Sequence, residues 1–300
     1  GPLDRWKEKV DAYVDALCKE LEFIAERSRN KKLNTIYIGG GTPTTLTAEQ
    51  LERLMSWIDE KFSREHLLEY TVEAGRPDSI TEEKLKVIKC HDITRISINP
   101  QSMQQKTLDA IGRKHTVEQT KEAFSLARTL GFDNINMDLI VGLPGEDKAM
   151  VENTLDEVRK LAPDSITVHS LAVKRAARLN IFKDKYQEMT FENNQEIMDM
   201  TMKAAYELEM GPYYLYRQKN MKGNFENVGY AKVDKAGIYN ILIMEEKQPI
   251  IALGAGGSSK LVFDHGKRIE RVENVKDVTN YISRIDEMIE RKRTGIQTWL

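Results

Sequence analysis

The sequence predicts an α/β protein in which parallel strands alternate with helices. Short apolar strands and longer segments with apolar residues near every 3.6 positions follow one another in regular order. A glycine-rich turn at residues 39–41 comes directly after the first expected strand. Polar residues gather at the ends of the later strands, where ligands bind in such folds. Alternating strands and helices pair in parallel through right-handed crossovers.

Composition limits the class of protein. The 300 residues are 40% apolar and 31% charged, as in a soluble globular chain of one large or two modest domains. A net charge of -2 predicts no nucleic-acid partner. No apolar run approaches the roughly 20 residues that span a bilayer, so we expect no membrane association. Two cysteines suit a reducing cytosol, and the predicted location is cytoplasmic.

The elements can be placed in order along the chain. Residues 10–25 form a helical apolar stripe that includes Cys18, which we expect to be a small core residue. The expected strands are Thr35–Ile38, Glu69–Glu73, Arg95–Ile98, Asn134–Val141 and Ser165–Leu171. The expected helices between them are Ala48–Phe62, Glu82–Lys89, Val117–Leu130 and Ala149–Leu161. Gly131 directly follows the third of these helices, at the position where a glycine commonly ends a helix.

The turn after the first strand reads G-G-G-T-P-T at residues 39–44. Glycines adopt backbone angles that other residues avoid and let a ligand approach main-chain N–H and C=O groups. Thr47 and Gln50 form the pattern of a capping box that opens the next helix. Two interpretations stay open, an ordinary strand-to-helix turn and a turn that receives a ligand.

Polar residues occur at the ends of later strands, namely Glu73, Asn99 and Gln101. Asp138 is a further polar residue, which lies within an apolar strand. A buried carboxylate needs a partner, so Asp138 requires either a ligand or a cation such as Arg113 or Arg95. His169 ends the fifth strand, where it is either a hydrogen-bonded structural histidine or a residue near the substrate. The other histidines show no metal-ligand spacing, and no metal site is predicted.

Together these motifs resemble one family. The G-G-G-T-P-T turn, a Glu that ends the next strand, S-x-x-x-Q-S, an Arg after a short helix and D-L-I-x-G-L-P occur in this order within about 35–173. This order resembles the oxygen-independent coproporphyrinogen III oxidases, which are radical S-adenosylmethionine enzymes. Residues 211–231 resemble their HemZ-type branch. One departure is Pro100, which lacks the N–H usual at that position.

The resemblance implies a partial (β/α)6 barrel, lacking its first strand, in residues 1–180. A smaller α+β domain in residues 181–300 would cover the substrate. It also implies a set of residues that contact S-adenosylmethionine: Gly40, Gly41, Thr42, Glu73, Gln101, Arg113, Asp138 and Ala172. No residue is assigned to catalysis.

The family holds a 4Fe–4S cluster on three cysteines spaced C-x3-C-x2-C, and this spacing is absent here. Gly1 and Pro2 resemble a protease-cleavage scar, so we expect the cluster segment to precede them in the natural protein. The full-length protein would then bind S-adenosylmethionine and a 4Fe–4S cluster. The present chain alone is expected to be inactive.

The second half is less regular. Residues 191–210 predict a helix whose apolar face contains Ile197, Met200, Met202, Tyr206 and Met210. A following strand offers Tyr214, Tyr216, Arg217 and Lys219 to a carboxylated substrate, or is simply a solvated basic strand. Residues 237–244 and 249–254 predict a hairpin, and 275–291 an amphipathic helix. The glycine-rich turn at 252–259 either meets a ligand or closes a sheet.

The resemblance implies the oxidative decarboxylation of coproporphyrinogen III propionates to vinyl groups through a 5′-deoxyadenosyl radical. The implied partners are a porphyrinogen and an electron donor such as a flavodoxin or ferredoxin, with the protein acting as a monomer. A haem chaperone on the same barrel is the alternative. The His-Asn…Tyr-Trp pattern of haem chaperones is absent from the chain, which disfavours that alternative.

Overall fold

The structure is a computed structural model that describes residues 2–143, 145–170, 195–217, 226–246, 248–297 and 299. The chain divides into two compact units. Unit 1 contains Gly1–Ile36, Leu46–Leu68 and Leu242–Leu300, and unit 2 contains Tyr37–Thr45 and Glu69–Ile241. The predicted boundary at residue 180 lies outside the described residues and stays a prediction.

A seven-stranded sheet has the order β1-β2-β3-β4-β5-β7-β6. Its strands are β1 (Thr35–Ile38), β2 (Glu69–Gly75), β3 (Arg95–Gln101), β4 (Ile135–Val141), β5 (Ser165–Ser170), β6 (Gly211–Arg217) and β7 (Glu226–Ala231). Strands β2 to β5 pair in parallel, whereas β7 is antiparallel to both β5 and β6. The five strands expected from the first 171 residues are all present, and their ends agree with the expected ones to within three residues.

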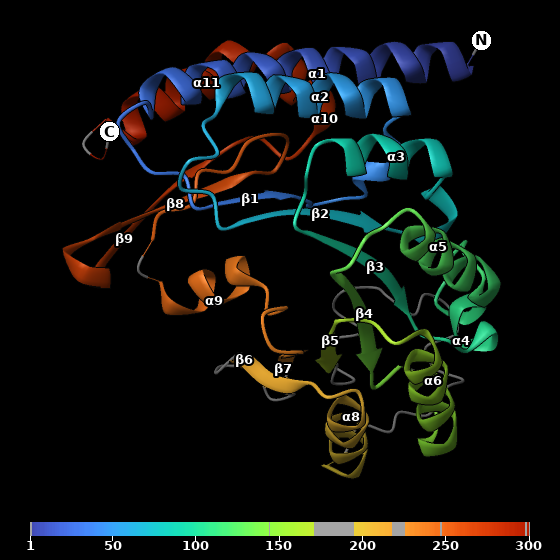
Figure 1. Cartoon of the computed structure of the whole chain (residues 1–300). Helices are drawn as coiled ribbons and strands as arrows, with labels where there is room; N and C mark the ends of the chain where they lie inside the picture. Colours follow the sequence, from blue (N-terminus) through green and yellow to red (C-terminus); the bar gives the residue numbers. More distant parts are fainter. Residues whose placement is uncertain are drawn as a thin grey trace. The chain divides into compact units, whose positions relative to one another are not determined.

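In unit 2, one or two helices follow each of the strands β2 to β5 along the chain. They are α3 (Glu82–Cys90), α4 (Gln105–Ala110), α5 (Val117–Thr129), α6 (Lys148–Leu161) and α8 (Gln195–Glu207). Helices α5, α6 and α8 follow one another along the outside of the curved sheet (Figure 1). Gly131 follows α5 with a φ of +93°, as its predicted role requires. The predicted fold class, an α/β partial barrel with a smaller C-terminal α+β part, is confirmed.

The apolar face predicted for α8 is only partly correct. Ile197 and Met210 are buried, but Met202 is 37% exposed and Tyr206 is 53% exposed. The buried side of the helix also carries the small residues Thr201, Ala204 and Ala205. The predicted face therefore overlaps the buried side only in part, because alanine and threonine supply much of the packed surface. Residues 191–194 of this prediction lie outside the described residues.

Unit 1 is built around α1 (Pro2–Arg27), which packs against α2 (Ala48–Lys61), α10 (Val278–Ser283) and α11 (Ile285–Gly295). A hairpin of β8 (Ser258–Phe263) and β9 (Arg268–Glu273) completes it. The capping box of α2 is confirmed by reciprocal hydrogen bonds between Thr47 and Gln50. Cys18 is buried, as predicted. None of the described helices combines the length and apolar character that crossing a membrane requires.

Two predictions for the last 65 residues are wrong. Residues expected as a strand at 237–244 form helix α9 (Ile238–Glu245), and residues 249–254 contribute only an isolated bridge between Ile250 and Lys260. Glu69 explains the helix, because its carboxylate accepts the first N–H groups of α9. The helix expected at 275–291 breaks at Arg284 into α10 and α11.

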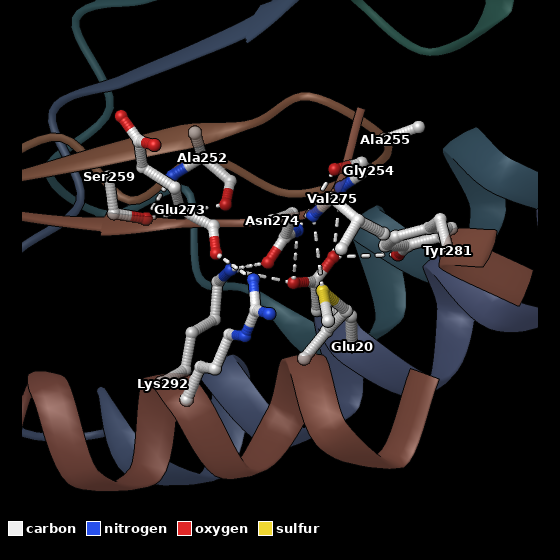
Figure 2. A network of polar contacts seen from close by, with 12 residues as sticks. Glu20, Ala252, Gly254, Ala255, Ser259, Glu273, Asn274, Val275, Tyr281 and Lys292 are labelled. Carbon is white, nitrogen blue, oxygen red and sulfur yellow. Dashed lines mark hydrogen bonds and ion pairs between the residues drawn. The ribbon is translucent and has the colours of Figure 1, made fainter. Parts of the chain in front are cut away.

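The glycine-rich turn at 252–259 is held by a buried carboxylate on α1 (Figure 2). Glu20 Oε1 accepts hydrogen bonds from the Gly254 N–H at 2.8 Å and from the Tyr281 hydroxyl at 2.7 Å. Its Oε2 accepts from Asn274 Nδ2 at 2.9 Å and pairs with Lys292 Nζ at 2.7 Å. Glu20 and Lys292 are both fully buried.

The same turn leaves no room for a ligand at Gly254. A Cβ added there would lie 2.7 Å from the Tyr13 hydroxyl oxygen and 3.3 Å from Leu17 Cδ2. Asn274 also donates to the Gly254 carbonyl at 2.9 Å. Of the two roles left open for this turn, the contacts support closure against the core of unit 1.

Candidate cofactor site

The first glycine turn presents a bare backbone at the end of β1. Gly40 has a φ of +82°, which favours glycine. A Cβ added at Gly40 or Gly41 would meet no atom within 4 Å, so space is open beside both residues. Gly39 differs, because a Cβ there would contact the Tyr37 ring and lie 2.7 Å from Glu73 Oε2. The turn therefore has one packed side and one open side.

The exit of this turn is anchored to the end of β2. Thr44 donates from its hydroxyl to the Ala74 carbonyl at 2.6 Å. Lys84 Nζ donates to the Thr44 carbonyl at 2.5 Å and to the Ser79 carbonyl at 3.1 Å. Thr42 packs over Gly75, where an added Cβ would lie 3.1 Å from Thr42 Cγ2. These contacts fix the open backbone at Gly40 and Gly41.

Alanine substitutions separate the two sides of the turn. Gly39→Ala is expected to lower the free energy of unfolding by about 1–3 kcal/mol, because overpacking displaces Tyr37 or Glu73. Gly41→Ala is the matched control and is expected to cost less than about 0.5 kcal/mol, since its Cβ enters open space. Urea denaturation of both variants checks this. Equal losses would contradict the described packing.

A row of polar side chains crosses the sheet beside the turn. Asn99 Nδ2 donates to Glu73 Oε1 at 3.0 Å, and Ser97 donates to Asn99 Oδ1 at 2.7 Å. Asn136 Nδ2 lies 3.0 Å from Ser97 Oγ and 2.7 Å from Asp138 Oδ1. The strand register places Ser97 opposite both Glu73 and Asn136, which brings side chains from β2, β3 and β4 together.

Glu73 is fixed by donors from three sides. The Tyr37 hydroxyl and the Gly40 N–H donate to it, in addition to Asn99. Burial raises the pKa of Glu73, and the charge of Asp138 raises it further, although these hydrogen bonds oppose the shift. Tyr37 is itself stacked on Tyr239, with ring centroids 4.6 Å apart. Glu73 thus joins the glycine turn to the polar row.

Asp138 lies in the middle of the row, with its side chain 22% exposed. Among the described residues its partners are Asn136 and His169, whose Nε2 lies 3.6 Å from Asp138 Oδ2. The predicted alternative, an ion pair with Arg113 or Arg95, is not found there. His169 is hydrogen-bonded, as one of its two interpretations expected, and faces the row, while a place near the substrate stays a prediction.

Gln101 is the last residue of β3, and Arg113 follows α4. Gln101 adopts a left-handed φ of +67°, and its buried Oε1 has no hydrogen-bond partner among the described residues. Burial lowers the pKa of Arg113, and the positive charge of Arg76 lowers it further. Arg76 is bound by both oxygens of Asp78. In the described part of the chain no carboxylate pairs with Arg113, which leaves its guanidinium able to receive one.

Three of the residues predicted to bind the substrate, Tyr214, Tyr216 and Arg217, lie on β6. A hydrogen bond joins the Tyr214 hydroxyl to Thr167, and burial raises the pKa of Tyr214. Tyr216 is 42% exposed. Arg217 ends β6, where only its backbone is described, paired with Glu226. Lys219 and the cofactor candidate Ala172 lie outside the described residues. The structure thus connects only Tyr214 to the row.

Sequence reasoning missed several members of the site. Tyr37, Asn136 and Asn227 contact residues that it had named, and Tyr239 stacks on Tyr37. Asn136 had a usable signal, because residues two apart on a strand share a face and Asp138 was already a candidate. Asn227 and Tyr239 gave no such signal, since they come from a distant strand and from a helix expected as a strand.

The described residues do not form an iron–sulfur site. Cys18 is buried within α1, and Cys90 is exposed at the end of α3. No group of three His, Cys, Asp or Glu residues that could hold a metal ion occurs in the described ranges. A 4Fe–4S cluster needs cysteine thiolates that these residues do not supply. An amino-acid nucleoside, by contrast, carries hydrogen-bond donors and a carboxylate. The open turn and the acceptor row match its donors, and Arg113 matches its carboxylate.

Comparisons with known proteins identify the family of the chain. Residues 8–158 match the model of the Radical SAM superfamily. The oxygen-independent coproporphyrinogen-III oxidase-like protein HemZ of Bacillus subtilis is 45% identical over 287 residues, which cover 95% of this chain and 57% of the relative. The heme chaperone HemW of Lactococcus lactis is 29% identical over 296 residues, covering 97% and 72%.

A solved structure has the same fold. Coproporphyrinogen III oxidase (HemN) from Escherichia coli matches with a TM-score of 0.71 at 22% identity, covering 95% of this chain and 64% of that one. The chain therefore spans less than two thirds of the length of both HemZ and HemN. The matched family model covers more than half of the chain, including the glycine turn and β1 to β4. The chain belongs to the Radical SAM superfamily.

Proposed function

We propose that the chain forms the S-adenosylmethionine-binding part of an enzyme that oxidatively decarboxylates a porphyrinogen such as coproporphyrinogen III. The observation that carries the proposal is the open backbone of Gly40 and Gly41 beside the acceptors Glu73 and Asp138. The carboxylates suit the ribose hydroxyls as acceptors, and the Arg113 guanidinium suits the cofactor's carboxylate. Members of this superfamily use S-adenosylmethionine with a 4Fe–4S cluster for radical chemistry.

The chain's own residues would bind and orient this cofactor. The main chain at Gly40, Gly41 and Thr42 would meet its amino group. Gln101, together with Glu73, Arg113 and Asp138, would contact its ribose and carboxylate. Ala172 would border the adenine. Because the described residues supply no cluster ligands, those would come from another segment. An electron donor such as a flavodoxin or ferredoxin would be required, and the protein would act as a monomer.

For the substrate, we assign Tyr214, Tyr216, Arg217 and Lys219 to the tetrapyrrole. An aromatic ring can pack on a flat macrocycle, and a cation can grip a propionate. The support from the structure is limited to Tyr214, which reaches the polar row through Thr167. The name of the HemZ relative refers to coproporphyrinogen III, and these residue types are consistent with that substrate.

Binding of S-adenosylmethionine to the chain tests the proposal. Without a cluster to anchor the ligand we expect affinity in the millimolar range, which ligand-observed NMR detects. Glu73→Gln is expected to weaken binding about fivefold to tenfold, because one acceptor becomes partly a donor. Glu82→Gln on α3 removes an exposed carboxylate that pairs with Lys86 and serves as the control. Binding that is absent in the parent chain, or equal in both variants, would overturn the proposal.

A haem chaperone is the second candidate. The HemW relative favours it, because that match extends over 72% of the relative's length. The two candidates differ in what happens to the propionates. Incubation of the protein, extended by a cluster-binding segment, with coproporphyrinogen III or with haem separates them by mass spectrometry. Loss of CO₂ supports the oxidase, whereas transfer of intact haem supports the chaperone.

A further inference from the structure

His169 lies on β5 between two acceptor oxygens. Its Nδ1 is 2.7 Å from Asn227 Oδ1, and its Nε2 is 3.6 Å from Asp138 Oδ2. A neutral imidazole carries one N–H and one acceptor nitrogen, whereas an imidazolium carries an N–H on both nitrogens. Two facing oxygens therefore match the imidazolium form. His169 is half-buried, so its position is set by these partners rather than by bulk water.

The charges around His169 favour the same form. Burial by itself lowers the pKa of His169, but the ion pair with Asp138, the hydrogen bond to Asn227 and the negative charge of Glu73 outweigh burial and raise the pKa. Arg95 contributes a positive charge to this face, which acts on Tyr37 and Tyr214. Both tyrosines have raised pKa values through burial and are neutral near pH 7.

The other oxygen of Asp138 is fixed by Asn136. Ser165 donates to Asn136 Oδ1 at 2.9 Å, which orients the amide so that its Nδ2 faces Asp138 Oδ1 at 2.7 Å. Asn136 thus holds one carboxylate oxygen and His169 faces the other. The carboxylate is still 22% exposed, so lone pairs remain available to a ligand on the open side.

We propose that His169 is a positioning residue, which as an imidazolium holds the Asp138 carboxylate in the orientation that accepts the hydroxyl groups of a nucleoside ligand. The proposal rests on the proposed cofactor site and adds a pH dependence to it. Because the imidazolium is the protonated form, its contribution is complete at low pH and is lost as pH rises through the pKa of His169. Nucleoside binding should weaken over the same range.

The protonation state of His169 is measured directly by nitrogen-15 NMR of the histidine side chains in the 300-residue chain. We expect both ring nitrogens of His169 to stay protonated above about pH 6.5, where an unperturbed imidazole is half neutral. Asp138→Asn should lower the pKa of His169, and His169→Gln identifies its signal. A neutral His169 at pH 6.5 in the parent chain overturns the proposal, whether or not Asp138→Asn folds.

Adenosine is the binding probe, because its ribose carries the hydroxyl groups and it has no titrating group between pH 5.5 and 8.5. We expect its affinity for the parent chain to fall about fivefold to tenfold across this range. His169→Gln should bind adenosine weakly, with an affinity that does not change with pH. His265 is an exposed histidine of unit 1, and His265→Gln should behave as the parent chain does.

The outcomes separate this inference from the proposed function. If the adenosine affinity of the parent chain does not change with pH, or if His169→Gln keeps the pH dependence of the parent chain, the role of His169 is overturned and the cofactor site is left intact. Binding that is absent in the parent chain overturns the cofactor site, and the role of His169 with it. Thermal melting of each variant confirms that the comparison is made between folded proteins.

Discussion

Glu20→Ala is expected to lower the free energy of unfolding of unit 1 by about 3–5 kcal/mol, because it leaves the buried Lys292 ammonium without its counter-charge. The change also removes the acceptor of the Gly254 N–H and of the Tyr281 hydroxyl. Asn274 then remains the only described partner of Lys292 in this network. Urea denaturation, followed by a probe in unit 1, measures the loss.

A second ion pair in the same unit provides the control. Asp286 lies 2.6 Å from Lys19, but both side chains are more than half exposed. Asp286→Ala should therefore cost less than about 1 kcal/mol. The double variant Glu20→Leu with Lys292→Met should lose less than the sum of the two single changes, because no unpaired charge remains buried. A Glu20→Ala variant as stable as Asp286→Ala would contradict the buried network.

Glu69→Ala is expected to lower the free energy of unfolding by about 2–4 kcal/mol, because Glu69 is a buried acceptor at the start of α9. Its two oxygens accept the N–H groups of Ile238 at 3.0 Å and Tyr239 at 2.8 Å. The same change should weaken S-adenosylmethionine binding, since Tyr239 stacks on Tyr37 and Tyr37 donates to Glu73. Urea denaturation and ligand-observed NMR measure the two effects.

The control for this change is Glu49→Ala. Glu49 lies in the first turn of α2, is exposed, and leaves the cap of that helix to Thr47 and Gln50. Its removal should cost about 0.3–1 kcal/mol through the helix dipole alone. If Glu69→Ala is no more destabilising than Glu49→Ala, or leaves binding unchanged, Glu69 neither caps α9 nor supports the site.

Most of the partial barrel could be predicted because its signals are local. Alternating apolar residues mark each parallel strand, and the apolar spacing and caps of α2, α5 and α6 mark the helices. The polar residues of β2, β3 and β4 could be assigned to the candidate site because parallel strands end on one edge of a sheet. These features are encoded by residues that are close together in the sequence.

The remaining features depend on contacts between distant residues. The apolar run before Glu245 fits a strand or a helix equally well, and the choice is made by Glu69, 169 residues earlier than Ile238. The pairing of Asp138 with His169 follows from the register of β4 and β5, which one sequence does not reveal. Likewise, the role of the second glycine turn depends on Glu20, 234 residues before Gly254.

The most direct test of the cofactor site is a protein-observed NMR titration of the chain with S-adenosylmethionine. The largest amide shifts are expected at Gly40, Gly41 and Thr42 and at the sheet residues Glu73, Gln101 and Asp138. The amides of Gly254 and Gly257, in the closed turn of unit 1, should stay unchanged and serve as the internal reference. Shifts that gather at this second glycine turn, or none at Gly40 and Gly41, would contradict the site.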